Sequence, residues 1–328
     1  MSKTKIGVIG VGPVGSILSA HLINDGHEVY VVDVLSHLIE AIKEKGLQIV
    51  GVKELYARIE NAYTSIDQLH GIELNQIYIC TKTVDLPGVI KQLEKLNLEK
   101  TYLISFQNGI DNEEVLADHF PRENVFRGVT NYAGMITRPG VVKMTFFHPP
   151  NFIGNLVPES VEVAKSIAQL HSEAGIETKY TETIKKETWR KTILNSVLMP
   201  ISVITRLTMA KIMGHPELKA IVEALLMDFL EVAKMEGHVF EEDFFDKAIA
   251  YLSYAGDHKP SMLIDFEAGR PLEIDFLNNK IQEYAEKHAV PCKYNKLLCS
   301  IIKGLMLHRD VVKENQLNVY KDLENLNF

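Results

Sequence analysis

The sequence predicts an α/β domain followed by an all-helical domain, and three observations lead to this fold class. The first half alternates short apolar strand-like segments with segments of helical spacing. A glycine-rich turn that begins at Gly10 joins the first expected strand to the first expected helix. From about Thr183 the strand-like alternation stops, and apolar residues recur only at helical spacing. Such a sequence favours a doubly wound sheet with a parallel core, so we expect domains at 1–181 and 182–328.

The expected elements of the first domain follow this alternation in order. The strands are expected at Lys5–Ile9, 28–33, 47–50, 56–59, 76–80, 101–106, 124–128, 141–147, 151–156 and 178–180, those at 141–156 being antiparallel. The helices are expected at 16–22, 35–45, 86–96 and 161–174, the last closed by Gly175. Asp111 and Glu114 have the spacing of a capping box, which predicts a further helix after the strand at 101–106.

The second domain shows helical spacing alone. Its helices are expected at 193–204, 218–235, 243–254, 274–288 and 295–308, with Gly214-His215-Pro216 and Gly237 as interruptions. Cys292 and Cys299 lie seven residues apart on one helix face, so we interpret both as packing residues. The twelve histidines include no HxxxH pattern, and the sequence therefore predicts no metal site.

Composition and charge narrow the class of protein. The 328 residues are 46% hydrophobic and 24% charged, which is ordinary for a soluble globular protein. A net charge of −8 argues against partners that are nucleic acids or anionic membrane surfaces. The three cysteines form no CxxC pair, and a strand that begins at Lys5 leaves no room for a signal peptide. We therefore expect a cytoplasmic protein without a membrane span.

The turn after the first strand has the pattern of a dinucleotide-binding Rossmann domain. Gly10 is expected to make the tight turn, Gly12 to let the backbone approach a pyrophosphate, and Gly15 to let the helix pack closely on the strand. Pro13 suits a first helical turn, whose N–H groups and dipole favour an anion. The cofactor site predicted here consists of Gly10, Gly12, Pro13, Val14 and Gly15.

Asp33, at the end of the second strand, predicts which cofactor is used. A carboxylate at this place accepts hydrogen bonds from a ribose 2′-OH but repels a 2′-phosphate. The next residues, 34–37, include no Arg or Lys that could neutralise a phosphate. We therefore predict NADH rather than NADPH. The alternative is that Asp33 only caps the following helix.

Two polar segments follow strands whose carboxyl ends should border the ligand site. Thr81-Lys82 follows the strand at 76–80, and Gln107-Asn108-Gly109 follows the strand at 101–106. Lys82 is equally well a solvated loop lysine, and Asn108 a turn residue before glycine. Residue type alone leaves both interpretations open.

In the second domain, Lys191 and Asn195 project from one face of the first helix. Hydride transfer to a carbonyl needs a group that stabilises the developing negative oxygen and donates a proton. A lysine beside Trp189 and an apolar run can be partly desolvated, which lowers its pKa toward that of a useful general acid. The alternative is a surface lysine on an amphipathic helix.

Together these motifs resemble the ketopantoate reductase (2-dehydropantoate 2-reductase) family nearly from end to end. The resemblance rests on the glycine turn and on five further segments: 81–82, 107–109, 189–195, 261–263 and 273–278. It implies a Rossmann domain followed by a helical domain like the C-terminal domain of 6-phosphogluconate dehydrogenase. It also implies reduction of a 2-oxo acid to an (R)-2-hydroxy acid, on the cytoplasmic route to pantothenate and coenzyme A.

The resemblance also implies roles for particular residues. Lys191 is similar to the general acid of the family, and Glu273 to its carboxylate partner. The substrate-contacting positions are Asn108, Asn195, Ser261, Met199 and His258, and those beside the cofactor include Lys82, Asn108 and Glu273. Without the resemblance, Ser261 would be interpreted as a helix N-cap and Glu273 as a first-turn acid.

Three positions depart from the family pattern. Asp33 replaces the usual basic residue, which supports NADH. Met199 replaces an asparagine, and His258 stands at a polar position that is often asparagine. Each lost hydrogen-bonding group should weaken recognition of a polar substrate by about 1–3 kcal/mol. The sequence thus predicts reduction of ketopantoate, with a related NAD-dependent (R)-2-hydroxyacid dehydrogenase acting on another branched or aromatic 2-oxo acid as the first alternative. A non-catalytic dinucleotide sensor is the second, and a homodimer is one possible assembly.

Overall fold

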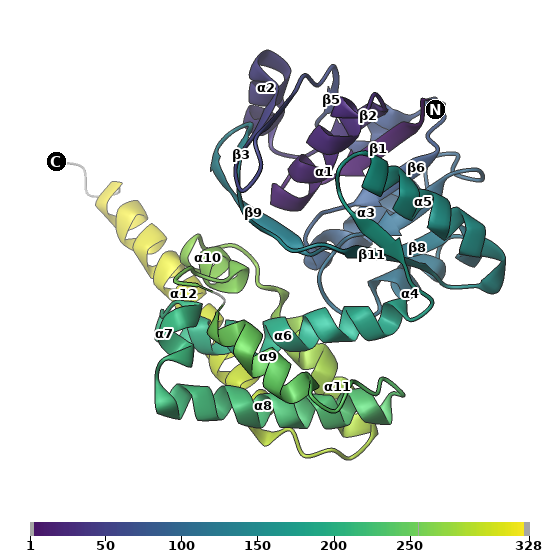
Figure 1. The fold of residues 1–328 in the computed structure, drawn as a ribbon. Coiled ribbons are helices and arrows are strands. Elements are labelled where there is room, and N and C mark those ends of the chain that lie inside the picture. The colour runs from purple at the N-terminus through teal and green to yellow at the C-terminus, as the bar shows by residue number, and fades with distance from the viewer. Residues whose placement is uncertain (1–2, 255, 325–328) are drawn as a thin grey trace. The chain divides into compact units, whose positions relative to one another are not determined.

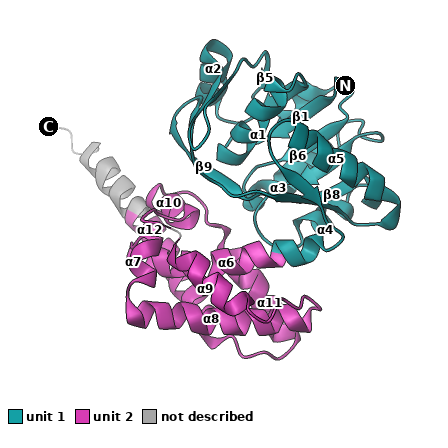
Figure 2. Ribbon diagram, in the orientation of Figure 1, with its two compact units in different colours: residues 1–188 teal, residues 189–328 magenta. Residues whose placement is uncertain are grey.

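The computed structural model describes residues 3–254 and 256–324. The chain divides into two compact units, residues 1–188 and 189–328 (Figure 2). Unit 1 is α/β and unit 2 is helical, so the predicted fold class is confirmed. The domain boundary between 181 and 182 stays a prediction; the division into units falls inside helix α6 (Ile184–Thr205). Within the described ranges, none of the helices combines the length and apolar character that a membrane span requires.

The main sheet of unit 1 has eight strands in the order β12-β11-β8-β7-β6-β1-β2-β5 (Figure 1). From β8 to β5 every neighbouring pair is parallel, while β11 runs antiparallel to β8, as predicted for this part of the chain. The strands are β1 (Lys5–Ile9), β2 (Glu28–Val32), β5 (Asn61–Tyr63), β6 (Gln76–Ile79), β7 (Tyr102–Ser105), β8 (Val125–Val129), β11 (Asn151–Asn155) and β12 (Thr178–Tyr180).

A second sheet of four strands, β4-β3-β10-β9, was not predicted. Its members are β3 (Leu47–Gly51), β4 (Leu55–Ala57), β9 (Tyr132–Arg138) and β10 (Val141–Phe147). Periodicity located three of these strands, but pairing depends on partners far away in the sequence: β3 pairs with β10 in parallel. The prediction missed β9 and the short β5.

Alternation along the parallel strands buries both faces of the main sheet. On one face, Val8, Val31 and Ile104 pack in a cluster with residues of α1, α2, α5 and the second sheet. On the other face, Ile77 and Leu103 pack in a cluster with residues of α3 and α4. Neighbouring residues of one strand therefore enter different cores, as expected for a sheet covered on both sides.

The helices of unit 1 agree with the prediction in number and order, and their ends differ by a few residues. They are α1 (Pro13–Asn24), α2 (Ser36–Lys45), α3 (Leu86–Leu93), α4 (Asn112–Ala117) and α5 (Val161–Glu173), with 3-10 turns η1 (Ile66–Leu69), η2 (Thr83–Asp85), η3 (Arg122–Asn124) and η4 (Pro158–Ser160). Pro13 occupies the first turn of α1, as predicted, so the helix begins three residues before the expected range of 16–22.

Unit 2 packs its helices around α8, which contacts α7, α9, α11 and α12. Its elements after α6 are α7 (Met209–Met213), α8 (Pro216–Met235), α9 (Phe244–Ser253), α10 (Ser261–Glu267), η5 (Glu273–Asp275), α11 (Asn278–Lys287) and α12 (Lys293–Glu324). The helix predicted over 274–288 is therefore two elements, because Leu277 leaves helical geometry with a ψ of −89°. Short helices α7 and α10 were not predicted.

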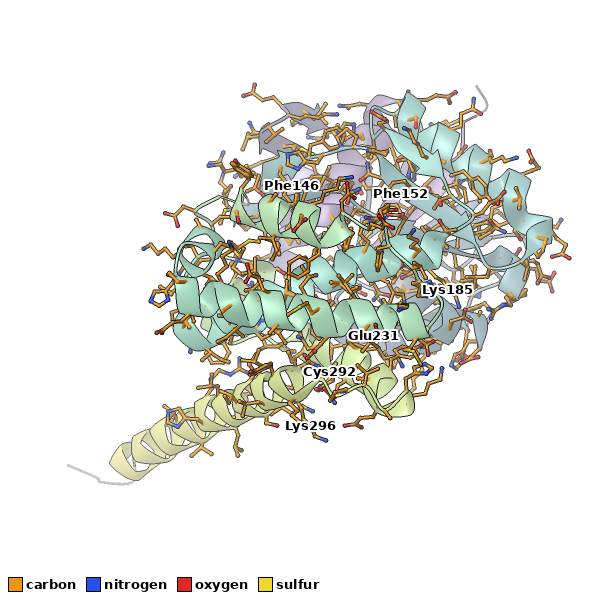
Figure 3. All side chains as sticks on the ribbon, turned by 60° about the horizontal axis from the view of Figure 1, so that its bottom comes forward. Phe146, Phe152, Lys185, Glu231, Cys292 and Lys296 are labelled. Carbon is orange, nitrogen blue, oxygen red and sulfur yellow. The ribbon has the colours of Figure 1, made fainter. Side chains whose placement is uncertain are left out.

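The cysteines of unit 2 behave as packing residues, as predicted. Cys292, labelled in Figure 3, is 2% exposed and Cys299 is 4% exposed. All three cysteines of the chain are free thiols. Burial raises the pKa of both Cys292 and Cys299 to about 12, which keeps them protonated and unreactive near neutral pH.

Candidate active site

The three glycines of the first turn differ in what the fold requires of them. Gly10 has a φ of +92°, and a Cβ there would lie 2.7 Å from the Thr81 nitrogen. At Gly15 a Cβ would lie 2.0 Å from the carbonyl oxygen of Gly10. At Gly12, however, φ is −68° and a Cβ would meet none of the described atoms within 4 Å. The fold therefore explains Gly10 and Gly15 but not Gly12, whose predicted role beside a ligand stays a prediction.

The first turn of α1 offers backbone donors beside Gly12. The helix begins at Pro13 after Gly12 as its N-cap, and no side chain caps it. The first N–H groups of a helix have no partner inside the helix, and they carry the positive end of its dipole. Pro13 and Val14 are half-buried in this turn, while Gly15 is buried. Such a turn fits a phosphate group.

The Asp33 carboxylate is held against the glycine turn by two backbone donors. Val11 N–H donates to Oδ2 at 2.8 Å, and Leu35 N–H donates to Oδ1 at 3.0 Å. The alternative interpretation of Asp33 as the cap of α2 is wrong, because Leu35 is the N-cap residue and no side chain caps that helix. The carboxylate is half-buried, and it is followed by the exposed apolar residues Val34 and Leu35. It is thus a fixed acceptor beside Gly12.

Direct hydrogen bonds join the two polar segments that follow β6 and β7. The Gln107 amide donates through Nε2 to Thr81 Oγ1 and to the carbonyl oxygen of Lys82, both at 3.2 Å. The carbonyl oxygen of Asn108 accepts from Thr83 Oγ1 and from Asn112 Nδ2, both at 2.7 Å. These bonds fix the backbone of Asn108 and take no part of its side-chain amide. Lys82 and Asn108 are both half-buried at this edge of the sheet.

A buried arginine supports the same loop and was missed in the sequence. Arg127, on β8, is 2% exposed, and its Nη2 donates to the carbonyl oxygen of Gly109 at 2.9 Å. Its Nη1 donates to Ser105 Oγ at 3.0 Å, and its Nε to Thr188 Oγ1 at 3.3 Å. The signal that could have revealed it is a charged residue in the middle of an apolar strand.

Glu113 is the acidic partner of Arg127 in this interior. Its Oε2 lies 3.7 Å from Arg127 Nε, and the residue is 1% exposed. Burial raises the pKa of the Glu113 carboxyl and lowers that of the Arg127 guanidinium, while their mutual attraction opposes both shifts. Removal of either partner would leave a buried polar group without its counterpart.

The predicted capping box at Asp111 and Glu114 is wrong. Asp111 adopts a left-handed conformation with φ +66°, whereas a capping residue needs extended backbone, and its side chain makes no capping bond. Glu114 instead pairs with Arg122 at 2.7 Å and with Lys185 at 2.6 Å, the latter labelled in Figure 3. These two ion pairs lower the pKa of Glu114, although burial opposes the shift.

In unit 2, α6 presents the predicted residues Lys191, Asn195 and Met199 at intervals of one turn. Lys191 and Asn195 are half-buried, while Met199 is 8% exposed and packs in an apolar cluster. Trp189 is 3% exposed and packs against the ring of Tyr284, at 5.3 Å between centroids. Trp189 therefore anchors the part of α6 that belongs to unit 2 in the core of that unit.

The remaining predicted residues lie on two segments attached to the same cluster. Met262 and Leu263 follow Ser261, and Leu272 and Ile274 flank Glu273; all four belong to the cluster that contains Met199. The structure thus brings the segments of α6, α10 and η5 together around one core. Glu273 is 5% exposed and begins η5, which agrees with a first-turn acid.

The interpretation of Ser261 as an N-cap is wrong. Pro260 is the capping residue of α10, and Ser261 is its exposed first residue. His258 is exposed, and its carbonyl oxygen accepts the N–H of Met209 at 3.2 Å. The predicted site residues divide between the two units. Unit 1 contains the glycine turn together with Asp33, Lys82 and Asn108, and unit 2 contains Lys191, Asn195, Met199, His258, Ser261 and Glu273. Their roles stay predictions.

Comparison with known proteins shows which family the chain resembles over most of its length. A family described as "Ketopantoate reductase PanE/ApbA" matches residues 6–157, and its C-terminal family matches residues 183–306. A 2-dehydropantoate 2-reductase of Pyrococcus abyssi strain GE5 is 30% identical over 92% of this chain and 97% of its own length. One from Lactococcus lactis is 27% identical over 91% of this chain and 96% of its own.

Solved structures show the same fold in both units. D-mandelate dehydrogenase, solved with NADH and anilino(oxo)acetate, has a TM-score of 0.84 and 25% identity, and covers 92% of this chain and 98% of its own. The 2-dehydropantoate 2-reductase of Methylococcus capsulatus has a TM-score of 0.80 and 28% identity, and covers 93% and 97%.

Proposed function

The chain belongs to the ketopantoate reductase family, and from that premise we propose that it reduces 2-dehydropantoate to (R)-pantoate with NADH as the preferred cofactor. Membership confirms the predicted enzyme class, an oxidoreductase. The product would feed the route to pantothenate and coenzyme A, in keeping with the predicted cytoplasmic location.

The observation that carries the choice of cofactor is the fixed carboxylate of Asp33. Its oxygens already accept from Val11 and Leu35, so it cannot swing away from a ligand seated on the glycine turn. A carboxylate accepts from ribose hydroxyls and repels a 2′-phosphate. The turn itself fits a pyrophosphate, because Gly12 leaves room for close approach and α1 offers its N-terminal donors.

The chemistry divides between hydride and proton. A bound nicotinamide supplies the hydride for the carbonyl carbon of the 2-oxo acid. The Lys191 ammonium would donate a proton to the carbonyl oxygen, which stabilises the alkoxide as it forms. The Glu273 carboxylate would hold that ammonium, and amide and hydroxyl donors of Asn108, Asn195 and Ser261 would bind the substrate.

Enzymes of the same reaction class act on 2-oxo acids with different substituents, and Met199 favours a substrate with an apolar substituent. A methionine at this position cannot form a hydrogen bond with the hydroxyl group of the substrate tail. Its presence therefore weakens binding of ketopantoate relative to an apolar 2-oxo acid. D-mandelate dehydrogenase, a structural relative, was solved with the aromatic compound anilino(oxo)acetate. The second candidate is therefore an NAD-dependent (R)-2-hydroxyacid dehydrogenase for branched or aromatic 2-oxo acids.

Steady-state kinetics with ketopantoate, 2-oxoisovalerate and benzoylformate, each with NADH and NADPH, distinguish these candidates. We expect the highest kcat/KM for ketopantoate with NADH. A higher value for 2-oxoisovalerate or benzoylformate would favour the second candidate. NADH binding without turnover of any acid would favour a dinucleotide sensor, and a preference for NADPH would contradict the role of Asp33.

A further inference from the structure

Helix α6 contains a proline in its interior, and this interrupts its hydrogen bonding. Pro200 has no N–H, so the carbonyl oxygen four residues earlier, on Ser196, has no donor from the helix. Ser196 is fully buried and Pro200 is buried too. A buried carbonyl group without a donor is costly, so a partner from another element is expected.

Asn278 supplies this donor. Its Nδ2 donates to the carbonyl oxygen of Ser196 at 2.9 Å, and Asn278 is itself fully buried as the first residue of α11. Asn295 on α12 binds both the side chain and the backbone of Asn278: Asn278 Nδ2 also donates to Asn295 Oδ1, and Asn295 Nδ2 donates to the backbone carbonyl oxygen of Asn278, both at 2.9 Å. The side chain is therefore fixed before it meets α6.

The bond joins the two segments that carry the proposed proton-transfer groups. Ser196 follows Asn195 and lies five residues after Lys191 on α6, and Asn278 lies five residues after Glu273. We infer that Asn278 is a positioning residue, which completes the interrupted helix at Ser196 and so sets Lys191 and Asn195 relative to Glu273. This inference rests on the proposed function for its catalytic part.

A double-mutant cycle with Pro200→Ala tests the inference. In the Pro200→Ala variant, the alanine N–H can donate to Ser196, so the carbonyl no longer depends on Asn278. Asn278→Ala alone should lower kcat roughly tenfold or more at a temperature where every variant is folded. In the Pro200→Ala background the same change should lower kcat by clearly less. Asn279→Ala is the matched control, since Asn279 bonds to Asp275 rather than to α6.

Urea unfolding of the same variants gives a readout that needs no activity. Asn278→Ala should lower the urea midpoint, and Pro200→Ala should recover part of that loss. Equal effects of Asn278→Ala in both backgrounds, on kcat and on the midpoint, would overturn the inference, as would failure of Asn278→Ala to fold in both.

The experiments distinguish failure of the proposed reductase activity from failure of the inference about Asn278. If the wild-type enzyme reduces none of the 2-oxo acids, the function falls and the catalytic part of the inference falls with it. The urea midpoints would still decide whether Asn278 supports α6 through Ser196. A lowered midpoint with an unchanged kcat would show a purely structural role and contradict the assignment.

Discussion

Unit 1 and unit 2 hold their predicted functional residues in different ways. In unit 1 the predicted site consists mainly of backbone groups. These are a glycine turn, the first N–H donors of α1, and loops fixed by hydrogen bonds to the carbonyl oxygens of Asn108 and Gly109. In unit 2 the predicted groups are side chains on three separate segments, held by one apolar cluster. The difference teaches that a backbone turn is encoded locally, whereas the placement of the predicted reactive groups depends on packing between distant segments.

The largest expected effect on turnover comes from a predicted reactive residue of unit 2, Lys191. Lys191→Ala should lower kcat by roughly 10²–10⁴-fold, because the carbonyl oxygen loses its proton donor. NADH binding, measured by fluorescence titration, should persist because the glycine turn and Asp33 lie in unit 1. Lys211→Ala, an exposed lysine on α7, is the matched control. A Lys191→Ala variant with near-native turnover would remove Lys191 from this role.

Two glycine substitutions test the backbone turn of unit 1. Gly15→Ala should destabilise the protein by about 3 kcal/mol, because its Cβ would meet the carbonyl oxygen of Gly10 at 2.0 Å. Gly12→Ala should leave stability nearly unchanged and weaken NADH binding by about tenfold, since only the ligand needs that space. Urea unfolding and fluorescence titration measure the two effects. A similar loss of stability in both variants would show that Gly12 is also a structural glycine.

Asp33 is the side chain of unit 1 whose change should alter cofactor choice. Asp33→Arg should raise the ratio of kcat/KM for NADPH to that for NADH by about tenfold to 100-fold, because a repulsive charge is replaced by an attractive one. Asp33→Asn keeps the shape without the charge and should give an intermediate ratio. An unchanged ratio in both variants would show that Asp33 does not contact the ribose.

The smallest effect concerns the core of unit 1. His171 is fully buried, with Nε2 2.7 Å from the Tyr78 hydroxyl, and burial lowers its pKa from 6.5 to about 3. Between these values the unfolded state binds a proton that the folded state does not, so stability falls as pH falls from 6.5 toward 3. The contribution of His171 is about 1.4 kcal/mol for each pH unit.

Urea unfolding at pH 7 and pH 5 measures this slope. His171→Gln cannot titrate and should show a smaller fall in the free energy of unfolding over the same interval. Trp189, the single tryptophan, lies in unit 2, so its fluorescence transition should depend less on this substitution than unfolding followed by circular dichroism. An identical pH slope in the two proteins would contradict the assignment.

Sequence patterns predicted the elements of this chain better than their partners. The family resemblance and the fold class are confirmed, and most strands and helices lie within a few residues of the expected ranges. The strand β9 was missed because its residues beyond Ala133 are half-buried or exposed, which hides the alternation. The capping box failed because the left-handed backbone of Asp111 is not visible in the identities of two residues.

The sequence by itself determined what depends on neighbours along the chain. Gly10, Gly12 and Gly15 beside a strand define a turn, and Asp33 at the end of β2 defines its acidic neighbour, because local geometry limits both. The tertiary structure alone decided that β3 pairs with β10, that Arg127 supports the loop at Gly109, and that Asn278 donates to Ser196. These contacts join residues 18 to 93 positions apart, and no local pattern encodes which buried group finds which partner.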